Sequence, residues 1–67
     1  MTNLELKAPT GKFRVIGVDT FDGTDWISGD FDTLDEAKQK AKDEGGTMLK
    51  THVYDDAGKH VFEAGSF

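Results

Sequence analysis

The 67-residue chain has no cysteine, a single proline and no long apolar run. Without cysteine there are no disulfides and no thiolate-held metal, so a chain this short must rely on a small packed core or on self-association. The lack of a long apolar run argues against a membrane-spanning helix, and the N-terminal MTNLELKAPT has neither the basic start nor the apolar stretch of a secretory signal. We therefore expect a cytoplasmic protein with no membrane partner.

Basic residues are also scarce: eight lysines and arginines stand against 13 aspartates and glutamates, for a net charge of −5. The segment 15–37 contains no base at all, but it contains Asp19, Asp22, Asp25, Asp30, Asp32, Asp35 and Glu36. Such a surface repels phosphate backbones, which makes nucleic acid an unsuitable partner. The simplest interpretation is a solvated acidic face, and the alternative is an acidic decoy of a nucleic-acid-binding protein.

Hydrophobic patterning predicts two β-hairpins separated by one helix. β-Branched and aromatic residues indicate strands at 12–19, 25–31, 47–54 and 60–64. The helix follows Thr33, which begins a T-x-x-E capping box with Glu36, and Gly45 is placed to end it. Its apolar stripe is thin, with Leu34, Ala37 and Ala41 on one side.

Strands on both sides of a single helix predict an α+β fold with two layers. We expect a four-stranded antiparallel sheet with the helix on one face, built from residues 12–67 as a single ββαββ domain. Residues 1–11 lack sustained periodicity and end in Ala8-Pro9-Thr10, which predicts a flexible N-terminal arm.

Two turn motifs predict the strand pairing. If Asp22-Gly23 forms a two-residue turn, Val18 lies opposite Ile27. One face of that hairpin then carries Ile16, Val18, Ile27 and Phe31, and the other carries Val15, Gly17, Trp26 and Ser28. In the second hairpin, a three-residue loop closed by Gly58 pairs Tyr54 with His60 and Val53 with Val61. That register puts Leu49, Val53 and Val61 on one face, and Met48, His52, Tyr54, His60 and Phe62 on the other.

One helix can cover only one face of such a sheet, and the pattern does not decide which. We expect the uncovered face to carry apolar groups and to contact a protein partner or a second copy of the chain. The expected contact residues are Trp26, Val15, Tyr54 and Phe62. For Trp26 the alternative is a core position, and for Tyr54 and Phe62 the side of the sheet stays open.

The order of features from about Trp26 onward resembles a group of short bacterial ββαββ proteins of unknown function. The matching residues are Trp26, Asp32-Thr33, Glu36-Ala37, Gly45-Gly46, His52, Asp56, Gly58-Lys59, Glu63 and Phe67. The resemblance covers about two-thirds of the chain and consists mostly of capping and turn residues. It implies the fold and no catalytic residue, and the acid-rich first hairpin departs from the pattern.

Two clusters invite a metal interpretation. Asp19, Asp22 and Asp25 could hold calcium, although the spacing around Gly23 fails that of an EF-hand loop. His52 and His60, with Asp55 or Asp56 nearby, could hold a transition metal. The histidines are offset on adjacent strands and no third strong ligand completes the set, so we predict no metal site and no cofactor.

Catalytic arrangements are absent from the pattern. Ser28 lies in mid-strand without an elbow turn, and Asp30 and Asp32 have no concave surface in which a carboxyl pKa would shift. Gly45-Gly46 ends a helix and so cannot present amides to a phosphate. We therefore expect a protein that is not an enzyme.

The sequence thus predicts a small non-catalytic protein-interaction or regulatory module. It would act through the open sheet face or through a strand edge. Calcium binding by the acidic first hairpin is the alternative, and the acidic decoy is the second alternative.

Overall fold

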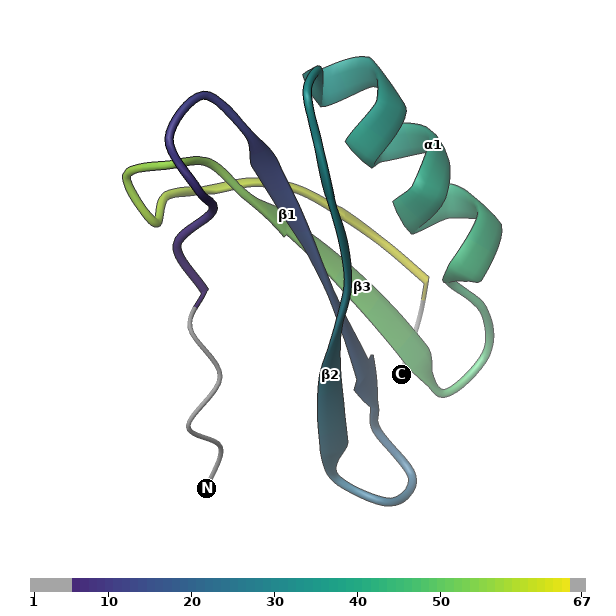
Figure 1. Cartoon of the computed structure of the whole chain (residues 1–67). Helices are drawn as coiled ribbons and strands as arrows, with labels where there is room; N and C mark the ends of the chain where they lie inside the picture. Colours follow the sequence, from purple (N-terminus) through teal and green to yellow (C-terminus); the bar gives the residue numbers. More distant parts are fainter. Residues whose placement is uncertain (1–5, 66–67) are drawn as a thin grey trace.

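A computed structural model of the chain describes residues 6–65 and contains four strands and one helix in these residues (Figure 1). The elements are β1 (Phe13–Asp19), β2 (Thr24–Phe31), α1 (Leu34–Glu44), β3 (Leu49–Tyr54) and β4 (His60–Ala64). The predicted order of hairpin, helix and hairpin is confirmed. No helix in these residues is long and apolar enough to cross a membrane.

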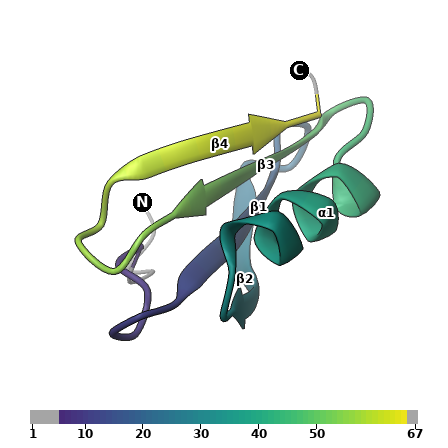
Figure 2. The ribbon, with the colours of Figure 1, turned by 90° about the horizontal axis from the view of Figure 1, so that it is seen from above.

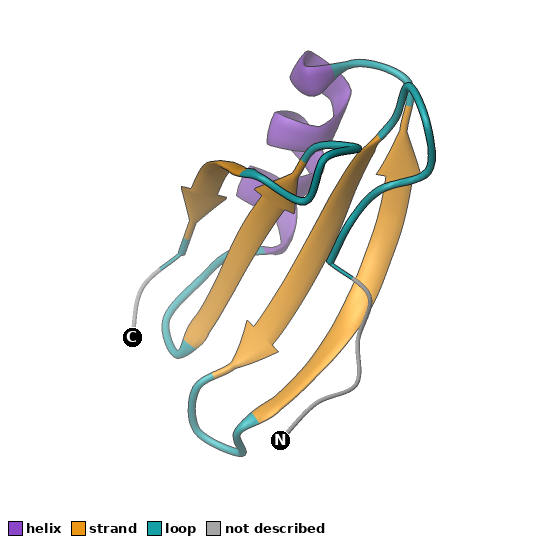
Figure 3. Ribbon diagram, turned by 90° about the vertical axis from the view of Figure 1, so that its left-hand side faces the viewer, coloured by secondary structure: helices purple, strands orange, loops and turns teal. Residues whose placement is uncertain are grey.

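All four strands form one antiparallel sheet in the order β2-β1-β3-β4. Helix α1 lies on one face of this sheet, which confirms the two-layer α+β fold (Figure 2). The opposite face, called the open face below, has no helix or strand of the described chain packed on it (Figure 3). The two inner strands come from different hairpins, so β1 and β3 join the hairpins into one domain.

Helix α1 begins and ends as its sequence predicts. Thr33 Oγ1 accepts the Glu36 N–H at 3.2 Å and lies 3.1 Å from the Glu36 carboxylate, to which it donates. At the other end the Gly45 N–H donates to the Ala41 carbonyl. Gly45 has a φ of −65°, which any residue can adopt, so its backbone conformation does not require glycine. Close packing does require it, because a Cβ there would lie 2.9 Å from the backbone nitrogen of Gly65.

The core lies between α1 and the centre of the sheet. Val15 and Val53 from the inner strands and Ala37 and Ala41 from the helix are fully buried. Because alanine is small, the helix backbone approaches the sheet closely enough for Thr51 Oγ1 to donate to the Ala41 carbonyl at 2.7 Å. Partly buried residues complete the layer: Phe13, Phe31, Leu34, Val61, Phe62 and Ala64.

The predicted register of the first hairpin is wrong. Its loop contains four residues, and Asp19 pairs with Thr24, so Ile16 rather than Val18 lies opposite Ile27. A two-residue turn of the favoured type needs positive φ at both positions, whereas only Gly23 has it here. The longer loop is stabilised by the Asp19 carboxylate, which accepts the N–H groups of Phe21 at 2.9 Å and Asp22 at 3.2 Å.

A β-bulge in the same hairpin changes the predicted faces. Val15 pairs with Gly29 and Ile16 with Ile27, which leaves Ser28 as the extra residue. Ile16 and Ile27 share the open face as predicted. Phe31, predicted to lie beside them, packs instead against the core under α1, because the bulge inverts the alternation beyond Ser28.

The loop of the second hairpin is confirmed, and the start of β3 is corrected. Gly58 has φ +80°, its N–H donates to the Asp55 carbonyl, and the Asp55 N–H donates to the Lys59 carbonyl. The third strand begins at Leu49 instead of residue 47. Met48 takes φ +63° in a tight turn that Gly46 and Leu49 close with two backbone hydrogen bonds.

The described part of the expected arm is attached to the loop between β3 and β4. Ala8 is only 3% exposed and its N–H donates to the Asp55 carbonyl at 3.1 Å. The Gly11 N–H donates to Asp56 Oδ2 at 2.9 Å. Residues 8–11 therefore pack with the domain. Residues 1–5 of the expected arm and residues 66–67 of the expected domain lie outside the described residues.

Replacing Thr51 by valine should lower the free energy of unfolding by about 1 kcal/mol, because valine keeps the shape but loses the buried hydrogen bond to Ala41. Chemical denaturation measures this difference. Thr24→Val, at an exposed position of β2, is the matched control and should change stability by less than about 0.5 kcal/mol. Equal effects of the two substitutions would show that the Thr51 hydroxyl does not anchor the helix.

Candidate functional site on the open sheet face

Three of the four expected contact residues lie on the helix side of the sheet. Val15 is fully buried beneath α1. Phe62 packs against the same core, with Lys38 Nζ and Lys42 Nζ 5.5 and 5.9 Å from the centre of its ring. The expected placement of Val15 and Phe62 on the uncovered face is therefore wrong.

Trp26 also lies on the helix side. Its indole ring covers Gly17, where a Cβ would come within 2.5 Å of the ring. The indole N–H donates to Ser28 Oγ at 3.1 Å, and Ser28 Oγ donates to the Glu44 carboxylate at 2.7 Å. A hydrogen bond from Lys40, followed by the one from Ser28, lowers the pKa of Glu44 against the opposing effect of burial. Trp26 thus joins β2 to the end of α1, and its expected placement on the uncovered face is wrong.

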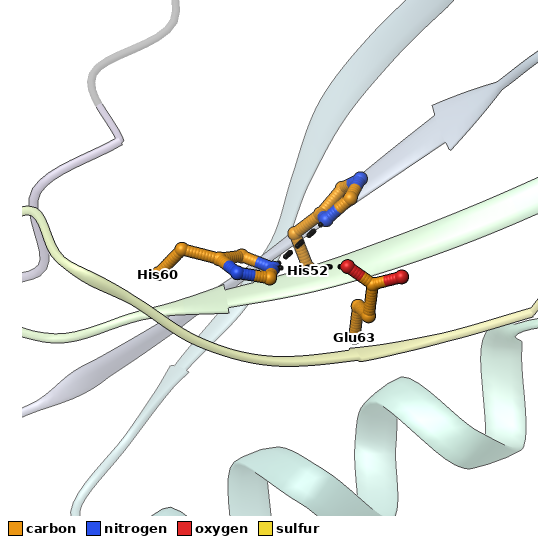
Figure 4. A group of neighbouring side chains, drawn as sticks. All are labelled: His52, His60 and Glu63. Atoms are coloured by element: carbon orange, nitrogen blue, oxygen red, sulfur yellow. Dashed lines mark hydrogen bonds and ion pairs between the residues drawn. The ribbon is translucent and has the colours of Figure 1, made fainter.

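Tyr54 does lie on the open face, where it forms an aromatic cluster with both histidines of the chain. Its ring centre is 5.4 Å from that of His60, at an interplanar angle of 61°, and 6.3 Å from that of His52. The two imidazoles are closer still, with His52 Nδ1 3.1 Å from His60 Nε2 (Figure 4). One nitrogen of this pair donates a hydrogen bond to the other. The predicted pairing of Tyr54 with His60 is confirmed, whereas the predicted pairing of Val53 with Val61 is wrong.

Glu63 is the member of the cluster that the sequence pattern did not predict. Its Oε1 lies 3.7 Å from His60 Nε2, and its Oε2 lies 2.7 Å from Lys50 Nζ. Residues three apart on a regular strand point to opposite faces, so His60 and Glu63 should not meet. They meet because Val61 forms a β-bulge: Tyr54 pairs with His60, whereas Val53 pairs with Phe62. The same bulge turns Phe62 into the core.

The surroundings shift the pKa values of two members of the cluster. Partial burial lowers the pKa of His52, and the neighbouring His60 lowers it further, while Glu63 opposes the shift. The hydrogen bond and the charge of Lys50 lower the pKa of Glu63. At neutral pH the cluster therefore contains a neutral His52 imidazole and a carboxylate anion, and both are forms in which lone pairs are available to a ligand.

His52, His60 and Glu63 are the one group of three or more possible metal-ligating side chains in residues 6–65, with donor atoms all within 4.8 Å of one another. The carboxylates expected to assist the histidines act elsewhere. Asp55 Oδ1 accepts the N–H groups of Ala57 and Lys59, and Asp56 accepts that of Gly11. The acids of the first hairpin do not form such a group.

Lowering the pH from 7.5 to 5.5 should destabilise the fold through His52. Because its pKa is lowered in the folded state, the unfolded chain takes up a proton first as the pH falls through the ordinary value of 6.5. Stability is therefore full above that value and decreases below it. Urea denaturation at both pH values should give a smaller decrease for His52→Gln than for the parent chain. An unchanged or larger decrease in His52→Gln would contradict this assignment.

Comparison of the chain with protein-family models, with curated proteins and with solved structures finds no match. The resemblance to short bacterial ββαββ proteins therefore stays a prediction. The function has to be inferred from the surface of this chain itself.

Proposed function

We propose that the chain is a small non-catalytic protein-interaction module that contacts its partner through the first hairpin and the adjoining open face. The observation that carries this proposal is Phe21, whose side chain is 79% exposed at the loop between β1 and β2. An aromatic side chain in water contributes almost nothing to folding. Burying it in a partner would contribute roughly 1.5–3 kcal/mol, as expected of a residue that dominates a protein interface.

Other exposed apolar side chains extend this surface. Met48 is 39% exposed and adjoins the hairpin loop, because the Thr20 N–H donates to the Met48 carbonyl at 2.9 Å. Ile27, which is 41% exposed, lies on the open face of β2 in the same hairpin as Phe21. We call Phe21, Ile27 and Met48 the hairpin patch. Phe21 is not among the contact residues that the sequence predicts, although an aromatic residue two positions before the hairpin glycine was the available signal.

The Asp19 carboxylate supports a fixed shape for the patch. It accepts two N–H groups in the loop, including that of Phe21 itself, so the loop needs no partner to define its backbone. A loop that is already ordered loses little conformational entropy on binding. This favours direct docking of Phe21 into an apolar pocket of the partner.

Charge around the patch favours a different protein over a second copy of this chain. The hairpin carries Asp19, Asp22 and Asp25, and no basic residue occurs between Val15 and Ala37. Two such hairpins facing each other would place like charges together, which disfavours association. A partner with an apolar pocket and a basic rim would complement both the ring and the carboxylates.

Phe21→Ala should abolish partner capture while leaving the free energy of unfolding within about 0.5 kcal/mol of the parent chain. The immobilised full chain, the Phe21→Ala variant and a Gln39→Ala control on exposed α1 would be incubated with extract of the native host. A partner retained by the parent and the control but lost by Phe21→Ala supports the proposal. Partners that bind all three proteins equally would contradict it, and a mass near twice that of the monomer in sedimentation would identify a second copy.

A further inference from the structure

The cluster of His52, His60 and Glu63 supports a second, separate inference. Its three side chains come from two neighbouring strands and converge on the open face, as Figure 4 shows. His60 and Glu63 are exposed and His52 is half-buried, so the donor atoms are accessible from solvent. The hairpin patch contains none of these residues, and the inference does not depend on the proposed protein contact.

The spacing of the donor atoms suits a single small cation. A tetrahedral zinc ion bound to nitrogens at roughly 2.0–2.1 Å holds them about 3.3 Å apart. His52 Nδ1 and His60 Nε2 are 3.1 Å apart, and Glu63 Oε1 is 3.7 Å from His60 Nε2. All three donor atoms lie within 4.8 Å of one another, so side-chain rotations that bring them closer would place them around one ion. We propose that His52, His60 and Glu63 bind a first-row transition-metal ion of the zinc class.

The donor types select the kind of ion. Two imidazoles and one carboxylate suit zinc, cobalt, nickel and copper, whereas calcium and magnesium prefer sites made entirely of oxygen. With three protein ligands, a fourth position would face solvent. Metal binding replaces the hydrogen bond between the imidazoles by two metal–nitrogen bonds. The proton in that bond then moves to the other nitrogen of its ring or leaves to solvent.

Neighbouring residues already contact all three ligands. Lys50 holds Glu63 Oε2 at 2.7 Å, so that Oε1 is the oxygen near His60. Tyr54 packs against both imidazole rings. Outer contacts of this kind fix the direction of metal ligands and reduce the reorganisation that binding requires. They also account for the convergence of the ligand atoms without an ion.

The test is a titration of the untagged full chain with zinc chloride at pH 7.5 in an isothermal titration calorimeter. We expect one ion per chain, no heat with calcium or magnesium, and visible absorption bands of tetrahedral cobalt when cobalt replaces zinc. His60→Ala and Glu63→Gln should each weaken zinc binding by more than the roughly 10–100-fold that loss of an outer contact costs. Circular dichroism confirms that each variant is folded.

Two control variants distinguish this site from zinc binding at another place on the chain. Asp22→Asn removes a carboxylate of the first hairpin, and Gln39→Ala changes an exposed side chain of α1, so both should bind zinc like the parent chain. Zinc binding that survives His60→Ala but is lost in Asp22→Asn would place the ion at the hairpin and overturn the proposal. No binding by the parent chain at millimolar zinc would overturn it as well, leaving a hydrogen-bonded histidine pair.

Discussion

One extra residue in β4 determines the character of both faces of the sheet. Val61 is the bulged residue, and beyond it the alternation of side chains is inverted. Phe62 consequently packs into the core beneath the lysines of α1, and Glu63 joins His60 on the open face. In a regular strand Phe62 would be exposed beside the histidines, and Glu63 would carry a charge into the layer beneath the helix. The packing of the second hairpin and the ligand cluster therefore depend on the same local irregularity.

The helix side of the sheet contains most of what stabilises the domain. An eleven-residue helix with alanines at its buried positions provides little apolar area, so aromatic residues from the strands fill the remaining space. A second bulge, at Ser28, directs Phe31 into this layer. Trp26 closes it through the hydrogen bonds that run from its indole to Ser28 and Glu44. The open face contributes less, although Ile16 on that face is also buried.

The two proposed binding surfaces have no residue in common and use different physics. The hairpin patch combines an exposed ring with carboxylates, so apolar burial would supply affinity and charge would supply selectivity. The cluster on β3 and β4 combines imidazole and carboxylate donors, so coordination bonds would supply the affinity. Lys50 links the cluster to the rest of the sheet by its ion pair with Glu63. A bound cation would also reduce the negative charge of the chain. It would do so near the β4 edge of the sheet, away from the acidic residues of β2.

Local chemistry in the sequence was sufficient for the elements themselves. The capping pair of Thr33 and Glu36 defined the start of α1, and Gly58 defined the loop of the second hairpin, because both act over a few residues. The order of elements then fixed the two-layer fold. Only the tertiary structure decided which face α1 covers, the four-residue loop after Asp19, and the bulges at Ser28 and Val61. These features depend on how side chains from several strands fill the space under the helix. A bulge of one residue inverts the direction of every side chain that follows it in the strand, and it leaves no separate mark in the sequence.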